Sequence, residues 1–332
     1  MRYSGGTSLC SEFITENAMF NYPVTARLCS ICRNDSSNRI IQASEMMYGT
    51  KESFAYLHCA ACGVVHLLDI PADMSRFYPA QSYYSFHTAG YRLRATMKRW
   101  RDTLQEGSTP AAGWIRRRLP NVALSAMTLA APSRSTRVLD VGCGDGALLR
   151  SMALLGYKQL TGVDPLLTAA SQESGIRLLK GRLDIVQGQF DLISFHHSLE
   201  HIPDQVETLR QAAERLAPGG IVLVRIPTSD SLAFTAYGPN WVQLDAPRHL
   251  YLHSHRSIAH VAAQAGLSVR ELLCDSQPMQ FWASDMYCAG VPLMSPAARA
   301  FKRRHLRRYR EMSHWANEQL RGDQIVVTLV PA

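Results

Sequence analysis

From residue 137 onward, short apolar runs alternate with segments whose apolar residues recur at helical spacing. These apolar runs predict strands at 137–142, 160–164, 176–179, 190–195, 221–226, 267–273 and 325–330. The segments between them predict helices at 145–155, 203–216 and 254–265. Pro203 and Ser254 favour helix starts, and Gly266 favours a helix end. Regular alternation of strands and helices predicts an α/β fold with a doubly wound, seven-stranded, mostly parallel sheet.

The rest of the chain divides by composition. We predict four parts in chain order: a flexible tail at 1–24, a small domain at 25–87, a basic helical connector at 88–131 and the α/β domain at 132–332. The small domain holds strand-like runs such as 54–57, and the polar stretch 132–135 is typical of a linker. Before the last strand, residues 276–323 are rich in Arg, Met and aromatic residues. We predict that this stretch is a helical insertion or lid.

The composition is that of a globular protein. The chain has 332 residues, of which 46% are hydrophobic and 19% are charged, enough for one large core and one smaller unit. No window has the roughly 18 uninterrupted apolar residues that a membrane span needs. The N-terminus lacks the charged start and apolar core of a secretory signal, so we expect a cytoplasmic protein.

The formal net charge of +8 is concentrated in two clusters. The first comprises Arg92, Arg94, Lys98, Arg99, Arg101, Arg116, Arg117 and Arg118, and the second Arg299, Lys302, Arg303, Arg304, Arg307, Arg308 and Arg310. Such clusters suit an anionic partner: a phosphate-bearing substrate, an anionic lipid surface at the inner membrane face, or nucleic acid. The alternative is a solvated helix face.

The strongest motif lies at the end of the first predicted strand. Asp140 is followed by Gly142, Gly144 and Gly146, a Gly-x-Gly-x-Gly spacing that lets the backbone turn tightly and approach a ligand. A dinucleotide site would prefer Gly-x-Gly-x-x-Gly against pyrophosphate, which an acidic neighbour would repel. Asp140 suits a ligand that carries ammonium and sulfonium cations. Asp164 ends the second predicted strand, where a carboxylate can accept both hydroxyls of a ribose.

From 137 to about 273 the sequence resembles the class I S-adenosylmethionine (SAM)-dependent methyltransferases. The matching segments are the glycine loop and residues 162–164, 190–193 and 216–221. The resemblance implies a Rossmann-like sheet of seven strands, the last antiparallel between the fifth and sixth. It also implies that Asp140 lies near the methionyl amino group, that Gly142 and Gly144 line the cofactor, and that Asp164 holds the ribose. Asp184 is the acidic candidate for contact with the adenine.

Four polar side chains follow the fourth predicted strand, whose carboxyl end faces the ligand crevice in such sheets. They are His196, His197, Glu200 and His201. Methyl transfer to oxygen needs a base within about 3 Å of the hydroxyl, and we expect His201 or His197 in that role, with Glu200 beside them and His196 near the cofactor. The run from His197 to His201 resembles a subgroup that acts on small molecules, including quinones and sugars. Alternatively, Glu200 and His201 bond to each other or to the backbone and shape the cofactor loop.

The segment 240–250 follows the fifth predicted strand, on the same side of the sheet. Trp241 could wall the pocket, and Arg248 or His249 could meet an acidic group of the substrate. Equally, the segment could be a packed loop that leads into the next helix.

Cys29, Cys32, Cys59 and Cys62 form two Cys-x-x-Cys pairs separated by 26 residues. Two such pairs can share one tetrahedral ion, and four thiolates leave no open position, so we predict a structural Zn²⁺ in a zinc-ribbon-like domain. A redox dithiol is the alternative. We expect the other four cysteines to be buried thiols: Cys10, Cys143, Cys274 and Cys288.

A four-cysteine domain ahead of a class I methyltransferase domain resembles the sugar methyltransferases of deoxysugar and surface-polysaccharide pathways. The resemblance implies an enzyme that transfers a methyl group from SAM to a sugar, by O- or C-methylation, on a nucleotide-sugar or a lipid-linked glycan. Two alternatives stay open. One is an rRNA or tRNA methyltransferase with a zinc domain, which the net charge of +8 would suit. The other is a non-catalytic scaffold that binds SAM.

Overall fold

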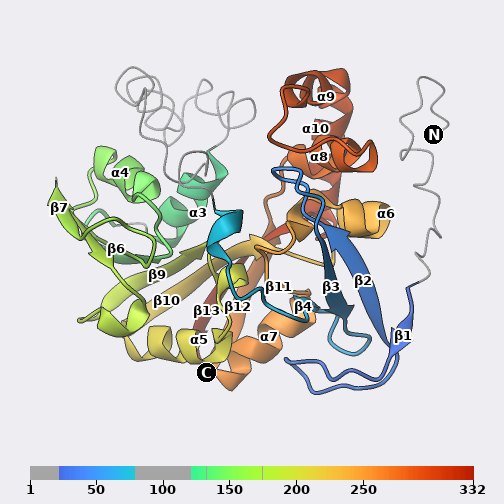
Figure 1. The fold of residues 1–332 in the computed structure, drawn as a ribbon. Helices are drawn as coiled ribbons and strands as arrows, with labels where there is room; N and C mark the ends of the chain where they lie inside the picture. Colours follow the sequence, from blue (N-terminus) through green and yellow to red (C-terminus); the bar gives the residue numbers. More distant parts are fainter. Residues whose placement is uncertain (1–21, 79–120, 132, 174) are drawn as a thin grey trace.

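The computed structural model describes residues 22–78, 121–131, 133–173 and 175–332 (Figure 1). Most of the predicted tail at 1–24 lies outside these ranges. So does the predicted connector at 88–131 up to residue 120, including the first basic cluster. The described end of the connector is helix α3 (Val122–Ala130).

Eight strands form the larger sheet, in the order β12-β13-β10-β9-β5-β6-β8-β7. Their bounds are β5 Arg137–Val141, β6 Gln159–Asp164, β7 Ser171–Glu173, β8 Ile176–Lys180, β9 Phe190–His196, β10 Leu216–Pro227, β12 Leu267–Cys274 and β13 Gln324–Pro331. Strands β10, β9, β5, β6 and β8 run parallel, and β13 lies antiparallel between β10 and β12. The predicted mostly parallel sheet, with its last strand between the fifth and sixth, is confirmed.

The prediction of seven strands was one short. Strand β7 pairs antiparallel with β8 and adds an eighth strand at the sheet edge. All three of its residues are exposed, so it carries no apolar signal in the sequence. The predicted helix at 203–216 is also shorter than expected. Helix α5 covers Gln205–Glu214, and β10 already begins at Leu216, with a register shift before Ile221.

Helices cover both faces of the larger sheet, as the alternating pattern predicted (Figure 1). On one face, α3 and α4 (Ala147–Leu154) bury apolar side chains such as Met127 and Leu149 in a shared cluster. On the other, α5 and α7 (His255–Gln264) bury side chains such as Leu209 and Ile258. Capping fixes where α7 starts, because the Ser254 hydroxyl accepts from the Ser257 backbone N–H and the Ser257 hydroxyl accepts from that of Ser254.

A smaller antiparallel sheet lies beside the larger one, in the order β1-β2-β3-β4-β11. Its strands are β1 Val24–Thr25, β2 Asn38–Ser44, β3 Ser53–His58, β4 Val65–Leu67 and β11 Tyr251–Leu252. Strand β11 comes from the loop after β10, far along the chain, and pairs with β4. The smaller sheet is therefore completed by a strand from the later, α/β part of the chain. The domain boundaries at 25–87 and 132–332 stay predictions.

A third layer of helices packs against the smaller sheet. It is formed by α6 Leu232–Tyr237, α8 Met279–Cys288, α9 Ala298–Arg304 and α10 Leu306–Glu318. Its apolar cluster combines Phe281 and Met286 of α8 with Tyr56 of β3 and Trp241 of the intervening loop. The segment predicted to be a helical insertion is helical, and Figure 1 shows it stacked beside β2 and β3. None of the described helices is both long and apolar enough to cross a membrane.

Gly142 lies where the glycine loop meets the segment after β9. Its φ is +77°, in the left-handed region, and a Cβ at this position would lie 2.3 Å from the Cβ of Ser198. Ser198 is itself fixed, because its hydroxyl donates to the carbonyl of Val141 at 2.6 Å. Only glycine meets both requirements, so this contact sets how closely the two loops approach.

Gly142→Ala is expected to destabilise the fold by more than Gly188→Ala, its matched control. Gly188 also has a positive φ, of +98°, but a Cβ there meets nothing within 4 Å. The control therefore measures backbone strain alone, about 1–3 kcal/mol, and Gly142→Ala adds the displacement of Ser198. Urea unfolding of the two variants measures the difference. Equal losses would show that the two loops are not in close contact.

Candidate functional site

The glycine loop connects β5 to α4 and is held by the residue that ends β6. Gly142, Gly144 and Gly146 all have positive φ. The carboxylate of Asp164 accepts the backbone N–H of Gly144 at 2.9 Å and that of Leu166 at 2.8 Å. Because each carboxylate oxygen has a second lone pair, Asp164 can still accept ribose hydroxyls. The structure thus brings the predicted ribose ligand to the glycine loop.

Asp140 lies under this loop with 2% of its surface exposed. The Ser194 hydroxyl donates to its Oδ1 at 2.7 Å. Burial nevertheless raises the pKa of Asp140 to about 7, an effect that the nearby Asp164 reinforces. A buried carboxyl at this position is ready to ionise when a cation arrives, as the predicted ammonium contact requires.

The two other predicted cofactor contacts lie at strand ends along the same edge. Asp184 is exposed in a 3-10 turn (Leu183–Ile185) beyond β8, and its side chain accepts the backbone N–H of Ile185 at 3.1 Å. His196 is the last residue of β9. Burial holds its pKa well below the usual value, an effect to which Arg225 contributes, so His196 is neutral.

His197 is held on both ring nitrogens. Its Nε2 accepts from Arg225 at 2.7 Å and from the side-chain amide of Gln324 at 3.0 Å. Its Nδ1–H therefore donates to Oε1 of Glu200, at 3.2 Å. With no lone pair left for a substrate proton, His197 does not fit the predicted role of general base. It is a positioning residue for Glu200.

His201 fits that role better. It ends a 3-10 turn (Leu199–His201), and its Nδ1–H donates to the backbone carbonyl of Arg248 at 2.8 Å, which leaves the lone pair on Nε2. The hydroxyl of Tyr78, from the N-terminal part of the chain, lies 3.3 Å from the same Nδ1. Burial and the neighbouring His249 lower the pKa of His201, although Glu200 partly opposes them. The imidazole is thus neutral and can accept a proton.

Glu200 and His249 complete a cluster around His201. Glu200 is fully buried, and its Oε2 has no hydrogen-bond partner. Burial alone would raise its pKa, but the hydrogen bond from His197 and the nearby imidazoles lower the pKa to about 2. The rings of His201 and His249 stand edge to face, with centroids 4.8 Å apart. One ligand atom from each residue of the Glu200–His201–His249 cluster lies within 4.8 Å of the others.

The loop 240–250 is packed rather than open to substrate. Trp241 is fully buried, and its indole N–H donates to Asp323 at 3.2 Å. Arg248, 1% exposed, donates to Asp245 at 2.6 Å and to Glu45 of the N-terminal part at 2.9 Å. The idea that Arg248 meets an acidic substrate is therefore wrong, because internal carboxylates already occupy its guanidinium. Sequence reasoning did not assign His249 to the cluster around His201, since only the folded loop brings it to Glu200.

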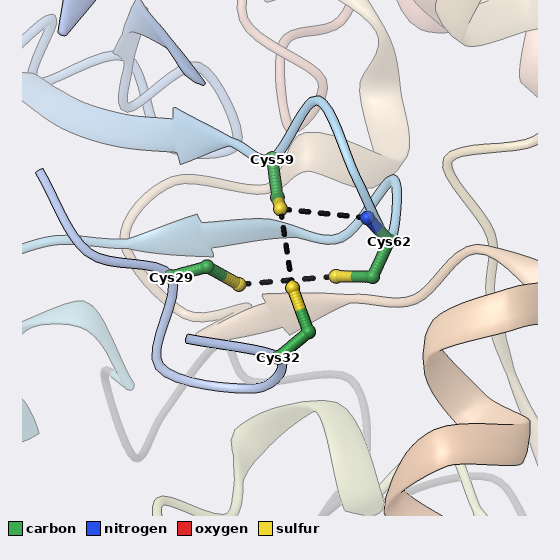
Figure 2. A group of neighbouring side chains, drawn as sticks. All are labelled: Cys29, Cys32, Cys59 and Cys62. Atoms are coloured by element: carbon green, nitrogen blue, oxygen red, sulfur yellow. Dashed lines mark hydrogen bonds between the residues drawn. The ribbon is translucent and has the colours of Figure 1, made fainter. Parts of the chain in front are cut away.

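The four predicted zinc ligands come together in the N-terminal part (Figure 2). The Cys29 and Cys62 sulfurs lie 3.8 Å apart, and those of Cys32 and Cys59 lie 3.5 Å apart. Ligands at a Zn–S distance of about 2.3 Å in a tetrahedron are about 3.8 Å apart, so the four sulfurs fit one Zn²⁺. With four thiolates around it, the ion would be structural.

The loop of the second cysteine pair is hydrogen-bonded to the segment after β10 and to the start of α7. Ser229 donates to the carbonyl of Gly63 at 2.7 Å, and Arg256 donates to that of Ala61 at 2.7 Å. Cys29 and Cys62 belong to the same apolar cluster as the inner face of the larger sheet. The metal centre is therefore built into the core that supports the cofactor loop.

Comparison with known proteins agrees with this geometry. Residues 112–272 match a family model described as a methyltransferase domain. The ubiquinone biosynthesis O-methyltransferase of Bordetella avium is 32% identical, over 42% of this chain and 65% of that protein. The corresponding protein of Bordetella bronchiseptica is 35% identical, over 40% and 61%. The chain thus spans less than two thirds of the length of these relatives.

The solved structures that resemble this chain are less similar to it in sequence than these relatives are. A SAM-dependent methyltransferase from Mesorhizobium loti has a TM-score of 0.40 and 16% identity, over 63% of this chain and 98% of that chain. The CcbJ methyltransferase from Streptomyces caelestis has a TM-score of 0.39 and 16% identity, over 63% and 89%.

Binding of SAM is expected to weaken by up to about tenfold when the pH falls from about 8 to about 6. Because the pKa of Asp140 is raised to about 7, its carboxyl is mostly ionised at the higher pH and mostly neutral at the lower one. Only the ionised form attracts an ammonium group. Isothermal titration calorimetry measures the effect, and Asp140→Asn should bind weakly at both pH values. If SAM binding to Asp140→Asn depended on pH as it does in the wild type, Asp140 would not be the group whose ionisation causes that dependence.

Cys29→Ser is expected to lose the bound zinc and to unfold at a lower temperature. Removing one thiolate breaks the tetrahedral site, and the binding energy of such an ion, on the order of several kcal/mol or more, is part of the folding energy. Emission spectroscopy of the purified protein measures the metal. Cys288→Ser, which removes a thiol outside the cluster, should keep about one zinc per chain. If Cys29→Ser kept its zinc, the four sulfurs would not be the ligands.

Proposed function

Since residues 112–272 match a family model of a methyltransferase domain, we propose that the protein transfers the methyl group of SAM to a hydroxyl oxygen of a small molecule. The hydroxyl oxygen would attack the methyl carbon as the bond from carbon to sulfur breaks. The products are the methyl ether, S-adenosylhomocysteine and one proton. The acceptor would lie over the Glu200–His201–His249 cluster, at the carboxyl edge of the larger sheet.

The observation that carries this proposal is the free Nε2 of His201. Its Nδ1–H is fixed on the Arg248 carbonyl, and no described residue bonds to Nε2. Because burial and His249 lower the pKa of His201, its imidazole is neutral near pH 7 and can take the proton of the hydroxyl. The same segment contacts the glycine loop, since Ser198 packs against Gly142. This contact supports a position of the proposed proton acceptor beside the expected cofactor.

We propose a phosphate-bearing sugar as the acceptor, in the form of a nucleotide-sugar or a lipid-linked glycan. The second basic cluster supports an anionic acceptor, since all seven of its basic side chains are exposed. Only Arg307 of this cluster has a carboxylate partner among the described residues, Glu311. The relatives are named O-methyltransferases, which supports oxygen as the acceptor atom. We expect the reaction to take place in the cytoplasm.

His201→Ala is expected to lower the rate of methyl transfer by about 10²–10⁴-fold and to leave SAM affinity nearly unchanged, because it removes the proton acceptor and no predicted cofactor contact. Single-turnover kinetics and calorimetry separate the two effects. His260→Ala is the matched control, since His260 is exposed on α7. Unchanged turnover in His201→Ala would remove His201 from the chemistry.

The acceptor is identified by incubating the protein and radiolabelled SAM with fractionated extract from cells that lack the protein. Label in nucleotide-sugar or lipid-linked glycan fractions, resistant to nuclease, would support the proposal. Label in RNA would overturn it, and label in a phenolic lipid would keep the oxygen acceptor and replace the sugar. The His201→Ala protein run in parallel shows whether the label depends on this site.

A further inference from the structure

We propose that Glu200, His201 and His249 bind a divalent first-row transition-metal ion, at a site separate from the four cysteines. The three residues come from two segments, the turn after β9 and the loop before β11. Carboxylate and imidazole together are suitable ligands for such ions. The existence of the ion site is independent of the proposed function, whereas its use in catalysis rests on that function.

Both histidines are oriented as metal ligands are. Nδ1–H of His201 donates to the carbonyl of Arg248 at 2.8 Å, and Nδ1–H of His249 donates to the carbonyl of Gln243 at 2.7 Å. Each ring therefore carries its lone pair on Nε2. A backbone carbonyl that accepts the second N–H is the usual outer contact of a metal-bound histidine, because it fixes both the tautomer and the plane of the ring.

The carboxylate of Glu200 is the negatively charged ligand of the proposed site. It is fully buried, and its Oε2 has no hydrogen-bond partner, which is costly for an ionised group. Its Oε1 accepts from His197 at 3.2 Å and lies 4.0 Å from Nε2 of His249. One ligand atom from each of the three residues lies within 4.8 Å of the others, so a cation between the carboxylate and the two imidazoles would satisfy the charge of Glu200.

The charged groups around the cluster have a net negative charge, which favours a cation. Among the described residues close to the cluster, the guanidinium of Arg248 is shared by Asp245 and Glu45. These three groups have a net charge of −1, and Glu200 adds another. Among the described residues Glu200 is not paired with a guanidinium, because Arg225 pairs with Asp275 and bonds to the rings of His196 and His197. A divalent ion would neutralise this buried charge.

Three protein ligands leave at least one position of the ion open, the arrangement typical of catalytic rather than structural sites. Under the proposed function, a substrate hydroxyl could take that position, where the ion would lower its pKa. With the ion bound, Nε2 of His201 is a ligand, so the proton of the hydroxyl leaves to water instead of to His201. The loss of turnover in His201→Ala follows in either case, so metal binding has to be measured directly.

The test uses full-length protein loaded with zinc at the four cysteines and titrated with Mn²⁺, with the free ion followed by electron paramagnetic resonance. Mn²⁺ prefers oxygen and nitrogen ligands, so it leaves the thiolate site intact. We expect about one Mn²⁺ per chain, and at least tenfold weaker binding in Glu200→Gln and His249→Ala. His260→Ala should bind as the wild type does.

A second measurement needs no variant at the site, which covers the case that a variant misfolds. Pulsed resonance of Mn²⁺ bound to wild-type protein should show nitrogen couplings from the two imidazoles. No stoichiometric binding, or binding without these couplings, would overturn the proposal. If Mn²⁺ binds with the couplings but methyl transfer is absent, the ion site stands and the proposed function fails. If transfer persists without Mn²⁺, the catalytic use of the ion is overturned.

Discussion

The guanidinium of Arg248 is the contact on which the arrangement of the site depends. It is buried, and it joins Glu45 of the N-terminal part to Asp245 of its own loop. The backbone carbonyl of Arg248 then orients His201, and the next residue is His249. Removing one partner of such a buried ion pair costs about 3–5 kcal/mol, even where the intact pair adds little net stability. Its role here is to fix geometry: one side chain sets the position of two imidazoles.

The four cysteines are tied to the proposed methyl-transfer site through the shared core. Cys29 and Cys62 share an apolar cluster with Leu139 of β5 and Phe195 of β9, the strands that lead into the glycine loop and the turn that holds His201. Ser229 binds the second cysteine pair through the carbonyl of Gly63. Zinc in the four cysteines would therefore hold the core in place beneath both halves of the site. The N-terminal part also reaches the site directly, through Tyr78 beside His201.

Features encoded by local pattern could be predicted from the sequence. The strands of the larger sheet, the glycine loop and the paired cysteines each follow from a few neighbouring residues, and the structure brings Asp164 and Gly144 into contact as expected. Contacts between distant segments could not be predicted in this way. The pairing of β11 with β4 and the approach of His249 to Glu200 both depend on how the loop after β10 folds back. The contacts of His197 could not be predicted for the same reason, because Arg225 and Gln324 lie on other strands.

The central claim is that cofactor and cluster meet at one edge of the sheet, with the transferable methyl group facing Glu200, His201 and His249. A crystal structure of the full chain with S-adenosylhomocysteine and Mn²⁺ tests this most directly. The account predicts that the sulfur of the ligand faces the cluster, and that an anomalous peak for manganese lies within about 2.0–2.3 Å of Glu200 Oε2. A sulfur directed away from the cluster, with no manganese between the two imidazoles, would contradict it.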